Sequence, residues 1–122
     1  MINGDAAGPL SEIKRLSERV FAVIDSDRDA PGANPPSSIR AFEAACQSLA
    51  IPVLIYERRT IENYLTGPAV QQIQGMAPLG PYERVPAGWS KARNWLVARD
   101  MTKVDFVSTD IGQFIQNTVL AT

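Results

Sequence analysis

Two apolar runs, separated by a loop and an amphipathic stretch, stand out in the first half of the chain. The first, VFAVI, covers residues 20–24, and the second, IPVLIYE, covers residues 51–57. Continuous apolar runs of this length, bounded by turn residues, are typical of strands buried on both faces of a parallel sheet. Between them, apolar residues recur at helical spacing from Ile39 to Leu49. The order strand, loop, helix, strand therefore predicts a βαβ unit with parallel strands and a right-handed crossover.

Further helices are expected on both sides of this unit. Apolar spacing and capping residues predict them near residues 9–19, 60–66, 69–75, 89–101 and 111–121. Proline and glycine concentrate in residues 26–38 and 75–88, which predicts two long loops. A short strand is also predicted at residues 1–3.

The same patterns predict the roles of individual side chains. Thr60 and Asp110 are expected to cap helices, as is Ser37 or Ser38. The side chains expected to face the core in the last two helices are Trp89, Ala92, Leu96, Ile111, Phe114, Ile115 and Val119, with Trp95 as a further candidate.

The composition narrows the chemistry that the chain can use. Its 122 residues suit one domain, and they contain a single cysteine, Cys46, and no histidine. Catalytic triads and zinc sites that need histidine are thereby excluded, as is an internal disulfide. The net charge of −1 predicts no general affinity for nucleic acid, so any such contact needs a local basic patch. Because the sequence shows neither a run of about 20 apolar residues nor a signal-peptide core, a soluble cytoplasmic protein without membrane contact is expected.

Acidic side chains follow both predicted strands. Asp25 and Asp27 come directly after the first strand, Glu57 ends the second, and Glu62 lies one helical turn further along. Ligands of parallel α/β sheets bind at the carboxyl ends of the strands. If the two strands are neighbours, these carboxylates meet at one edge, where their mutual repulsion favours a bound cation. Oxygen ligands without His or Cys suit Mg²⁺ or Mn²⁺.

Each of these acids also has an ordinary structural interpretation. Aspartates after a strand commonly bond the local backbone in a turn. Asp29, beside Pro31 and Gly32, is expected to do only that and to face solvent. Acids at the start of a helix offset the helix dipole, which would account for Glu57 and Glu62 without a metal.

Three basic residues have two interpretations as well. Arg58 and Arg59 are either surface charges or phosphate contacts, because the guanidinium fork matches phosphate oxygens. Lys91, which follows the second long loop, is either a solvated side chain or a group that stabilises negative charge in a transition state.

Taken together, these motifs resemble a known family. VFAVIDSDRD at residues 20–29, IYERRTIENYL at residues 55–65 and a helix that carries Lys91 resemble the Toprim domain of OLD-family (overcoming lysogenization defect) nucleases. These domains are fused to ABC-type ATPases and occur in Gabija-like phage-defence nucleases. The resemblance covers roughly residues 10–110. It implies that the chain is one Rossmann-like α/β Toprim domain, with a small parallel sheet flanked by helices.

The resemblance also implies an activity and roles for the residues. The implied activity is Mg²⁺-dependent (or Mn²⁺-dependent) hydrolysis of nucleic-acid phosphodiesters by an endonuclease. Asp25 and Asp27 would bind metal. Glu62, and Glu57 with it, would belong to a second metal position, and Lys91 and Glu62 would act in catalysis.

Two features of the family have no match in this chain. Toprim domains carry a catalytic glutamate on an earlier strand, in an apolar-E-G pattern, and nothing before Val20 supplies it. The ATPase signature G-x-x-x-x-G-K-[ST] is not found either. The chain is therefore expected to lack the first Toprim strand, and an ABC-type ATPase in trans is an expected partner. A second copy of this chain is another expected partner, because an exposed sheet edge pairs readily with other chains.

Two other functions stay open from the sequence. A catalytically degenerate Toprim module would bind nucleic acid, expected to be DNA, or a protein partner without cutting. Phosphotransfer by a haloacid-dehalogenase-like or receiver-like domain is a minor alternative, because Asp29 stands where the first of these motifs has Thr or Val.

Overall fold

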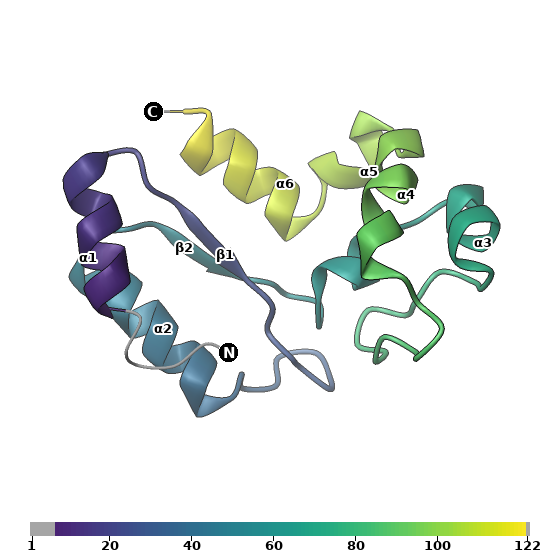
Figure 1. Ribbon diagram of the computed structural model, residues 1–122, viewed down its shortest axis with the longest axis horizontal. Helices are drawn as coiled ribbons and strands as arrows, with labels where there is room; N and C mark the ends of the chain where they lie inside the picture. Colours follow the sequence, from purple (N-terminus) through teal and green to yellow (C-terminus); the bar gives the residue numbers. More distant parts are fainter. Residues whose placement is uncertain (1–6, 122) are drawn as a thin grey trace.

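A two-stranded parallel sheet lies at the centre of one half of the molecule (Figure 1). The structure, a computed structural model, describes residues 7–121, apart from the side chains of residues 103 and 104, so the strand predicted at residues 1–3 lies outside it. Strands β1 (Ala22–Ile24) and β2 (Val53–Ile55) pair in parallel, with Ala22 opposite Val53. The predicted parallel pairing is confirmed, although both strands are shorter than the apolar runs that contain them.

Helices cover both sides of this sheet. Helix α2 (Ser37–Ser48) connects the two strands and buries Ile39 and Cys46, and α1 (Ala7–Leu16) packs against α2. In Figure 1, α6 (Asp110–Phe114) crosses the opposite side of the strands. The protein is therefore of the mixed α/β class, with a small parallel sheet. Within residues 7–121 the sheet has only these two strands, so each keeps an open edge.

The second half of the molecule is helical and has a core of its own. The 3-10 turn η2 (Ile61–Tyr64) leads into α3 (Pro68–Gln74), and after a long loop come η3 (Lys91–Arg93), α4 (Asn94–Asp100) and α5 (Lys103–Val107). Buried apolar side chains join α3 and α4 to the loop between them; they are Leu65, Ala69, Val70, Leu79, Trp89 and Val97. The two long loops and the helix near residues 69–75 are confirmed, whereas α5 was not predicted.

Tertiary contacts overturn several of the predicted side-chain roles. Asp110 does not cap α6, because Thr109 Oγ1 accepts the N–H of Gly112 (3.0 Å) instead. Asp110 lies in the first turn and accepts the Tyr64 hydroxyl (2.5 Å) and the Glu57 N–H (2.8 Å). This carboxylate thereby joins α6 to the end of β2 and to η2.

Other predicted caps and inward-facing residues were also wrong. Ser37 and Ser38 are the first residues of α2, and no side-chain hydrogen bond caps its start. Trp95 is 61% exposed and Ile115 43%, and Ala92 is exposed too. Helix α4 begins later than predicted, and its buried residue is Val97, which was not among those expected to face the core.

Gly112 allows α5 and α6 to approach closely. A Cβ atom at this position would overlap the backbone carbonyl of Phe106. Backbone atoms cannot yield as a flexible side chain can, so only glycine fits here. Beyond this point the helix continues as the π-helical segment η4 (Ile115–Val119).

We expect Gly112→Ala to lower the free energy of unfolding by at least the roughly 1–3 kcal/mol typical of overpacking, although alanine favours helices. The matched control is Gly8→Ala in α1, where nothing lies within 4 Å of the added methyl group. That variant should be neutral or more stable. Urea unfolding of both variants checks this, and equal stabilisation of both would contradict the close approach at Gly112.

Candidate functional site

The loop that follows β1 is bonded to the loop that follows β2. We call residues 25–29, DSDRD, the acid loop. The backbone N–H groups of Ser26 and Asp27 both donate to the carbonyl oxygen of Arg59, each at an N···O distance of 3.0 Å. The fully buried Ser26 hydroxyl donates to the carbonyl oxygen of Arg58 at 2.7 Å. The contact between the two strands thus continues past their ends and holds the acid loop in place.

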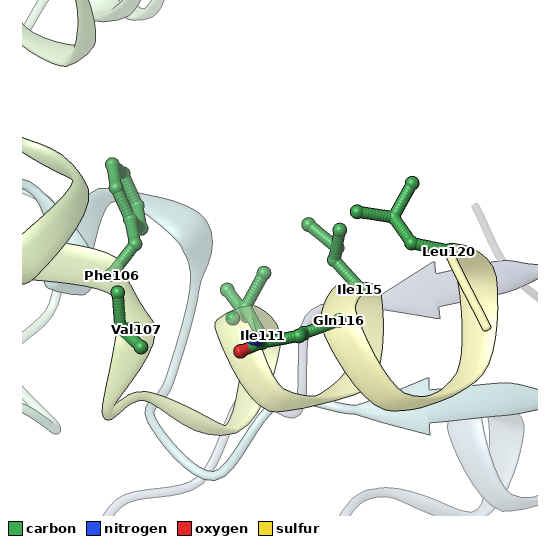
Figure 2. A pocket seen from close by; sticks show the side chains of 7 residues that line it. Phe106, Val107, Ile111, Ile115, Gln116 and Leu120 are labelled. Atoms are coloured by element: carbon green, nitrogen blue, oxygen red, sulfur yellow. The ribbon is translucent and has the colours of Figure 1, made fainter.

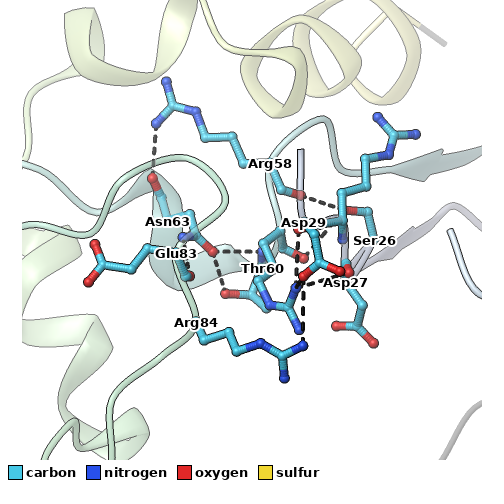
Figure 3. Close-up of polar contacts among 10 residues, drawn as sticks. Ser26, Asp27, Asp29, Arg58, Thr60, Asn63, Glu83 and Arg84 are labelled. Atoms are coloured by element: carbon cyan, nitrogen blue, oxygen red, sulfur yellow. Dashed lines mark hydrogen bonds and ion pairs between the residues drawn. The ribbon is translucent and has the colours of Figure 1, made fainter. Parts of the chain in front are cut away.

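The Arg59 guanidinium fixes the far end of the acid loop, whose residues Asp27 and Asp29 are labelled in Figure 3. Its Nη1 donates to the carbonyl oxygens of Asp27 (3.1 Å) and Arg28 (3.2 Å). The same atom forms a 2.7 Å ion pair with Asp29. The Arg59 side chain is 12% exposed and that of Asp29 is 74% exposed. Asp29 therefore faces solvent, as expected, and the arginine acts within the fold.

Asp27 has a left-handed backbone conformation, with a φ of 55°. Few residues other than glycine adopt it, but Asp and Asn tolerate it better than most. The turn brings the exposed Asp27 and the partly buried Asp25 to the wall of one cavity. An aspartate at position 27 therefore suits both the backbone and a site of negative charge.

Glu62 is held by the 3-10 turn that follows Thr60. The Thr60 N–H (2.8 Å) and hydroxyl (2.7 Å) both donate to Asn63 Oδ1, which confirms the predicted T-x-x-N start. The Glu62 side chain in this turn is buried, with 3% exposed. Its Oε2 accepts a 2.6 Å hydrogen bond from Asn94 Nδ2, at the start of α4. A buried carboxylate thus lies between two segments that are distant in sequence.

Asp25 is partly buried and is bonded to the start of η2. Its Oδ1 accepts the N–H of Ile61 at 3.2 Å. Burial raises the pKa of the Asp25 carboxyl; Glu62 and Asp27 raise it further, whereas the Ile61 N–H and the Lys91 ammonium oppose the rise.

Lys91 follows a residue that the core holds firmly. The preceding residue, Ser90, is bound by the side chain of the buried Gln74. Gln74 Nε2 donates to the Ser90 carbonyl oxygen, and Gln74 Oε1 accepts the Ser90 N–H, both at 2.8 Å. The exposed Lys91 side chain therefore extends from a fixed backbone.

Glu57 lies apart from this group. Its carboxylate forms a 3.3 Å ion pair with Arg28 and accepts the Tyr82 hydroxyl at 3.0 Å. Of the carboxylates expected at one edge, Asp25 and Asp27 line one cavity, whereas Glu62 is bonded to Asn94 and Glu57 to Arg28 and Tyr82.

The Arg58 side chain is also engaged within the protein. Its guanidinium donates to the carbonyl oxygen of Asn63 (2.9 Å) and lies over the Tyr64 ring, 4.8 Å from the centroid. With Arg59 bound to the acid loop, both side chains that were predicted as phosphate contacts have structural roles in the loop after β2.

An open cavity of about 560 Å³ adjoins Asp25 and Asp27. Ser38, from the first turn of α2, and Tyr56, after β2, also line it. Burial, together with the charges of Asp25, Asp110 and Glu62, raises the pKa of Tyr56 to about 12. The Tyr56 hydroxyl is therefore a neutral hydrogen-bonding group at neutral pH. The cavity volume lies within the range of small-ligand sites.

The carboxylate oxygens at this cavity suit a metal ion that keeps most of its bound waters better than a metal ion that is fully enclosed by protein ligands. Within the described part of the chain, no three His, Cys, Asp or Glu side chains group closely enough to hold an ion. Mg²⁺ characteristically takes one or two protein carboxylates and keeps several waters. Asp25 and Asp27, on the wall of an open cavity, fit that kind of site.

A second cavity, of about 410 Å³, lies along the C-terminal helices and has different chemistry (Figure 2). Its walls are Phe106, Val107, Ile111, Gly112, Ile115, Gln116 and Leu120. None of these side chains carries a charge, so this groove does not suit a metal ion or a phosphate.

Some residues of the site were not found from the sequence. Ser26 looked like one of many polar loop residues, and its position between two aspartates at a strand end was the one available signal. Asn94 gave no signal, because its partner Glu62 lies 32 positions earlier in the chain. Only the fold shows which of the many Asn and Ser residues are buried against charged groups.

Comparison with known proteins adds no relative: no family model, no curated protein and no solved structure matches this chain. Among the helices of residues 7–121, none has the length and apolar character needed to cross a bilayer.

The raised pKa of Asp25 predicts how stability depends on pH. A carboxyl whose pKa is higher in the folded than in the unfolded state binds more protons when folded, so its contribution to stability is lost as pH rises through the folded pKa. In the presence of a chelator, we therefore expect Asp25→Asn to be more stable than wild type at pH 7, with the difference shrinking below the ordinary aspartate pKa of 3.8.

Urea unfolding at several pH values measures this difference. Asn keeps an oxygen that can accept the Ile61 N–H, so the variant removes mainly the charge. The matched control is Asp29→Asn, which removes an exposed charge paired with Arg59 and should not stabilise the protein at pH 7. A gain for Asp25→Asn that does not depend on pH would contradict the electrostatic origin.

Proposed function

We propose that this chain is a Toprim-type nuclease domain that hydrolyses nucleic-acid phosphodiesters with Mg²⁺ or Mn²⁺. The observation that carries the proposal is that Asp25 and Asp27 line one open cavity at the carboxyl end of β1, in a loop that the residues after β2 hold in place. Carboxylates that repel one another beside an open cavity are costly for stability alone, and a bound cation would relieve the repulsion.

The residues divide the work between metal binding and charge stabilisation. Asp25 and Asp27 would hold the metal, and the buried Glu62 would contribute negative charge to the same part of the molecule. When bound, the ion would lower the pKa of a coordinated water and stabilise negative charge on the phosphate. The ammonium of Lys91 would neutralise charge that develops on the phosphoryl oxygens or on the leaving oxygen.

The substrate and partners belong to the same proposal. The substrate is nucleic acid, expected to be DNA, bound mainly through its phosphates, so affinity should fall steeply with salt. An ABC-type ATPase in trans and a second copy at an open strand edge are the proposed partners, in a cytoplasmic phage-defence system. Because Arg58 and Arg59 are bound within the fold, Lys91 is the cation that this proposal assigns to the phosphate.

We expect Asp27→Asn to reduce Mn²⁺-dependent nicking of supercoiled plasmid at least about 100-fold, because loss of a ligand should exceed the 10–100-fold typical of residues that only support a ligand. Asn tolerates the left-handed backbone at position 27, so the variant should fold. Asp29→Asn in the same loop is the matched control and should stay within about threefold of wild type.

Equal nicking by wild type and Asp27→Asn would exclude the proposed metal site. Wild-type protein that binds Mn²⁺ in calorimetry but does not nick plasmid would instead support the degenerate module, which binds without cutting.

A further inference from the structure

Tyr56, the residue that follows β2, is a buried side chain on the wall of the cavity beside the acid loop. It is 7% exposed and lines this cavity together with Asp25, Asp27 and Ser38. Its ring packs edge-on against the ring of Tyr64, in a small apolar cluster. The fold therefore sets the position of the ring and of the hydroxyl that it carries.

The Tyr56 hydroxyl has no hydrogen-bond partner among the described residues. Of the side-chain nitrogen and oxygen atoms that are sealed from solvent in this part of the chain, only Arg28 Nε lacks a hydrogen bond. The Tyr56 hydroxyl lacks one without being sealed, so solvent reaches it, and the cavity is the open space that this side chain lines. A buried hydroxyl without a partner is costly, whereas a ligand in the cavity would complete its hydrogen bonding.

The Tyr56 hydroxyl can donate its proton to a ligand oxygen at neutral pH. Its raised pKa of about 12 keeps it protonated, and a protonated phenol is a hydrogen-bond donor. The nearest carboxylate in the sequence of the cavity wall, Asp25, accepts the Ile61 N–H and no bond from Tyr56. The donor is therefore available to an acceptor that enters from outside the protein.

The start of α2 meets the same cavity and adds further donors. Ser38 and Ile39, in the first turn of this 12-residue helix, line the cavity wall. No side-chain hydrogen bond caps the start of α2, and the Ser38 hydroxyl has no partner among the described residues. The first turn of a helix presents unpaired N–H groups and a partial positive charge, which attract phosphate groups. Together with Tyr56, this part of the wall suits a ligand that is rich in acceptor oxygens.

The carboxylates of the cavity determine when such a ligand can bind. Asp25 and Asp27 would repel an anion that entered alone. A divalent cation on these carboxylates would reverse the effect, because a phosphate oxygen can contact the cation while other oxygens accept bonds from the wall. The cavity volume of about 560 Å³ leaves room for a phosphate group beside a hydrated ion.

We infer that Tyr56 binds the substrate phosphate, with its hydroxyl donating to a phosphate oxygen beside the cation on Asp25 and Asp27. Ser38 and the start of α2 bind the same phosphate group. The inference rests on the proposed function and deepens it, because it assigns the place where a nucleic-acid phosphate binds and two neutral groups that hold it.

The test uses calorimetry to compare binding of Mn²⁺ with binding of thymidylate, a nucleoside monophosphate that has no phosphodiester to cleave. Tyr56→Phe keeps the ring and removes the hydroxyl. We expect it to weaken binding of thymidylate to the Mn²⁺-loaded protein about 10-fold or more, as is typical when a hydrogen bond to a charged group is lost. Its affinity for Mn²⁺ should stay within about threefold of wild type. Thymidine, which lacks the phosphate, should not distinguish the two proteins.

A stability measurement and two further variants exclude a purely structural role. Because the Tyr56 hydroxyl has no partner within the described residues, Tyr56→Phe should resist urea at least as well as wild type. Tyr82→Phe is the matched control, since it removes a hydroxyl that donates to Glu57 outside the cavity, and it should leave thymidylate affinity unchanged. Ser38→Ala should weaken thymidylate binding but not Mn²⁺ binding. A less stable Tyr56→Phe that binds both ligands more weakly would overturn the inference.

The possible failures give different results. If wild type binds no Mn²⁺, the proposed metal site fails, and the phosphate site that depends on it fails too. If wild type binds Mn²⁺ but no thymidylate, or if Tyr56→Phe binds thymidylate as tightly as wild type does, only the inference about Tyr56 is wrong. Weaker binding of Mn²⁺ alone by Tyr56→Phe would also overturn it, because the hydroxyl would then hold a metal-bound water.

Discussion

The carbonyl oxygen of Arg59 is the point on which the acidic site depends. It accepts the N–H groups of both Ser26 and Asp27, so the loops after the two strands are joined at their backbones. The Ser26 hydroxyl and the Arg59 guanidinium reinforce the same connection. A strand pair of three residues each is too short to fix a loop by itself. These bonds fix the position of the acid loop, and of its carboxylates, relative to the sheet.

Holding acidic groups together in this way opposes stability, and the fold offsets it with neutral donors. Asp25 accepts the Ile61 N–H, and Glu62 accepts the amide of Asn94. Both donors stabilise charge without cancelling it, whereas the arginines nearby are bound to backbone carbonyls and to Asp29. The result is a partly buried region of negative charge, the environment that the proposed hydrated cation would need.

The two halves of the molecule meet around Tyr64 and Asp110. The Tyr64 ring packs edge-on against Tyr56, with centroids 5.6 Å apart, and its hydroxyl donates to Asp110. Ile111 completes this small apolar cluster. Because η2 also carries Glu62, the contacts that attach α6 to the end of β2 help to set the position of the site. In the short turn η2, Tyr64 therefore stabilises the fold, and its near neighbour Glu62 is a candidate site residue.

The sequence alone determined the parallel strand pair, the helix between the strands, the two long loops and the Thr60–Asn63 turn, because each depends on apolar periodicity or on local hydrogen bonds. It also pointed to Asp25 and Asp27, which directly follow a strand. It could not decide between Asp110 and Thr109 as the cap, because Asp110 is drawn to Tyr64 and Glu57, partners from another part of the chain. For the same reason, only the tertiary structure separated Glu57 from the acidic group, assigned the arginines to internal bonds and brought Asn94 to Glu62. Those outcomes depend on which side chains the fold buries together, and spacing along the chain does not encode that.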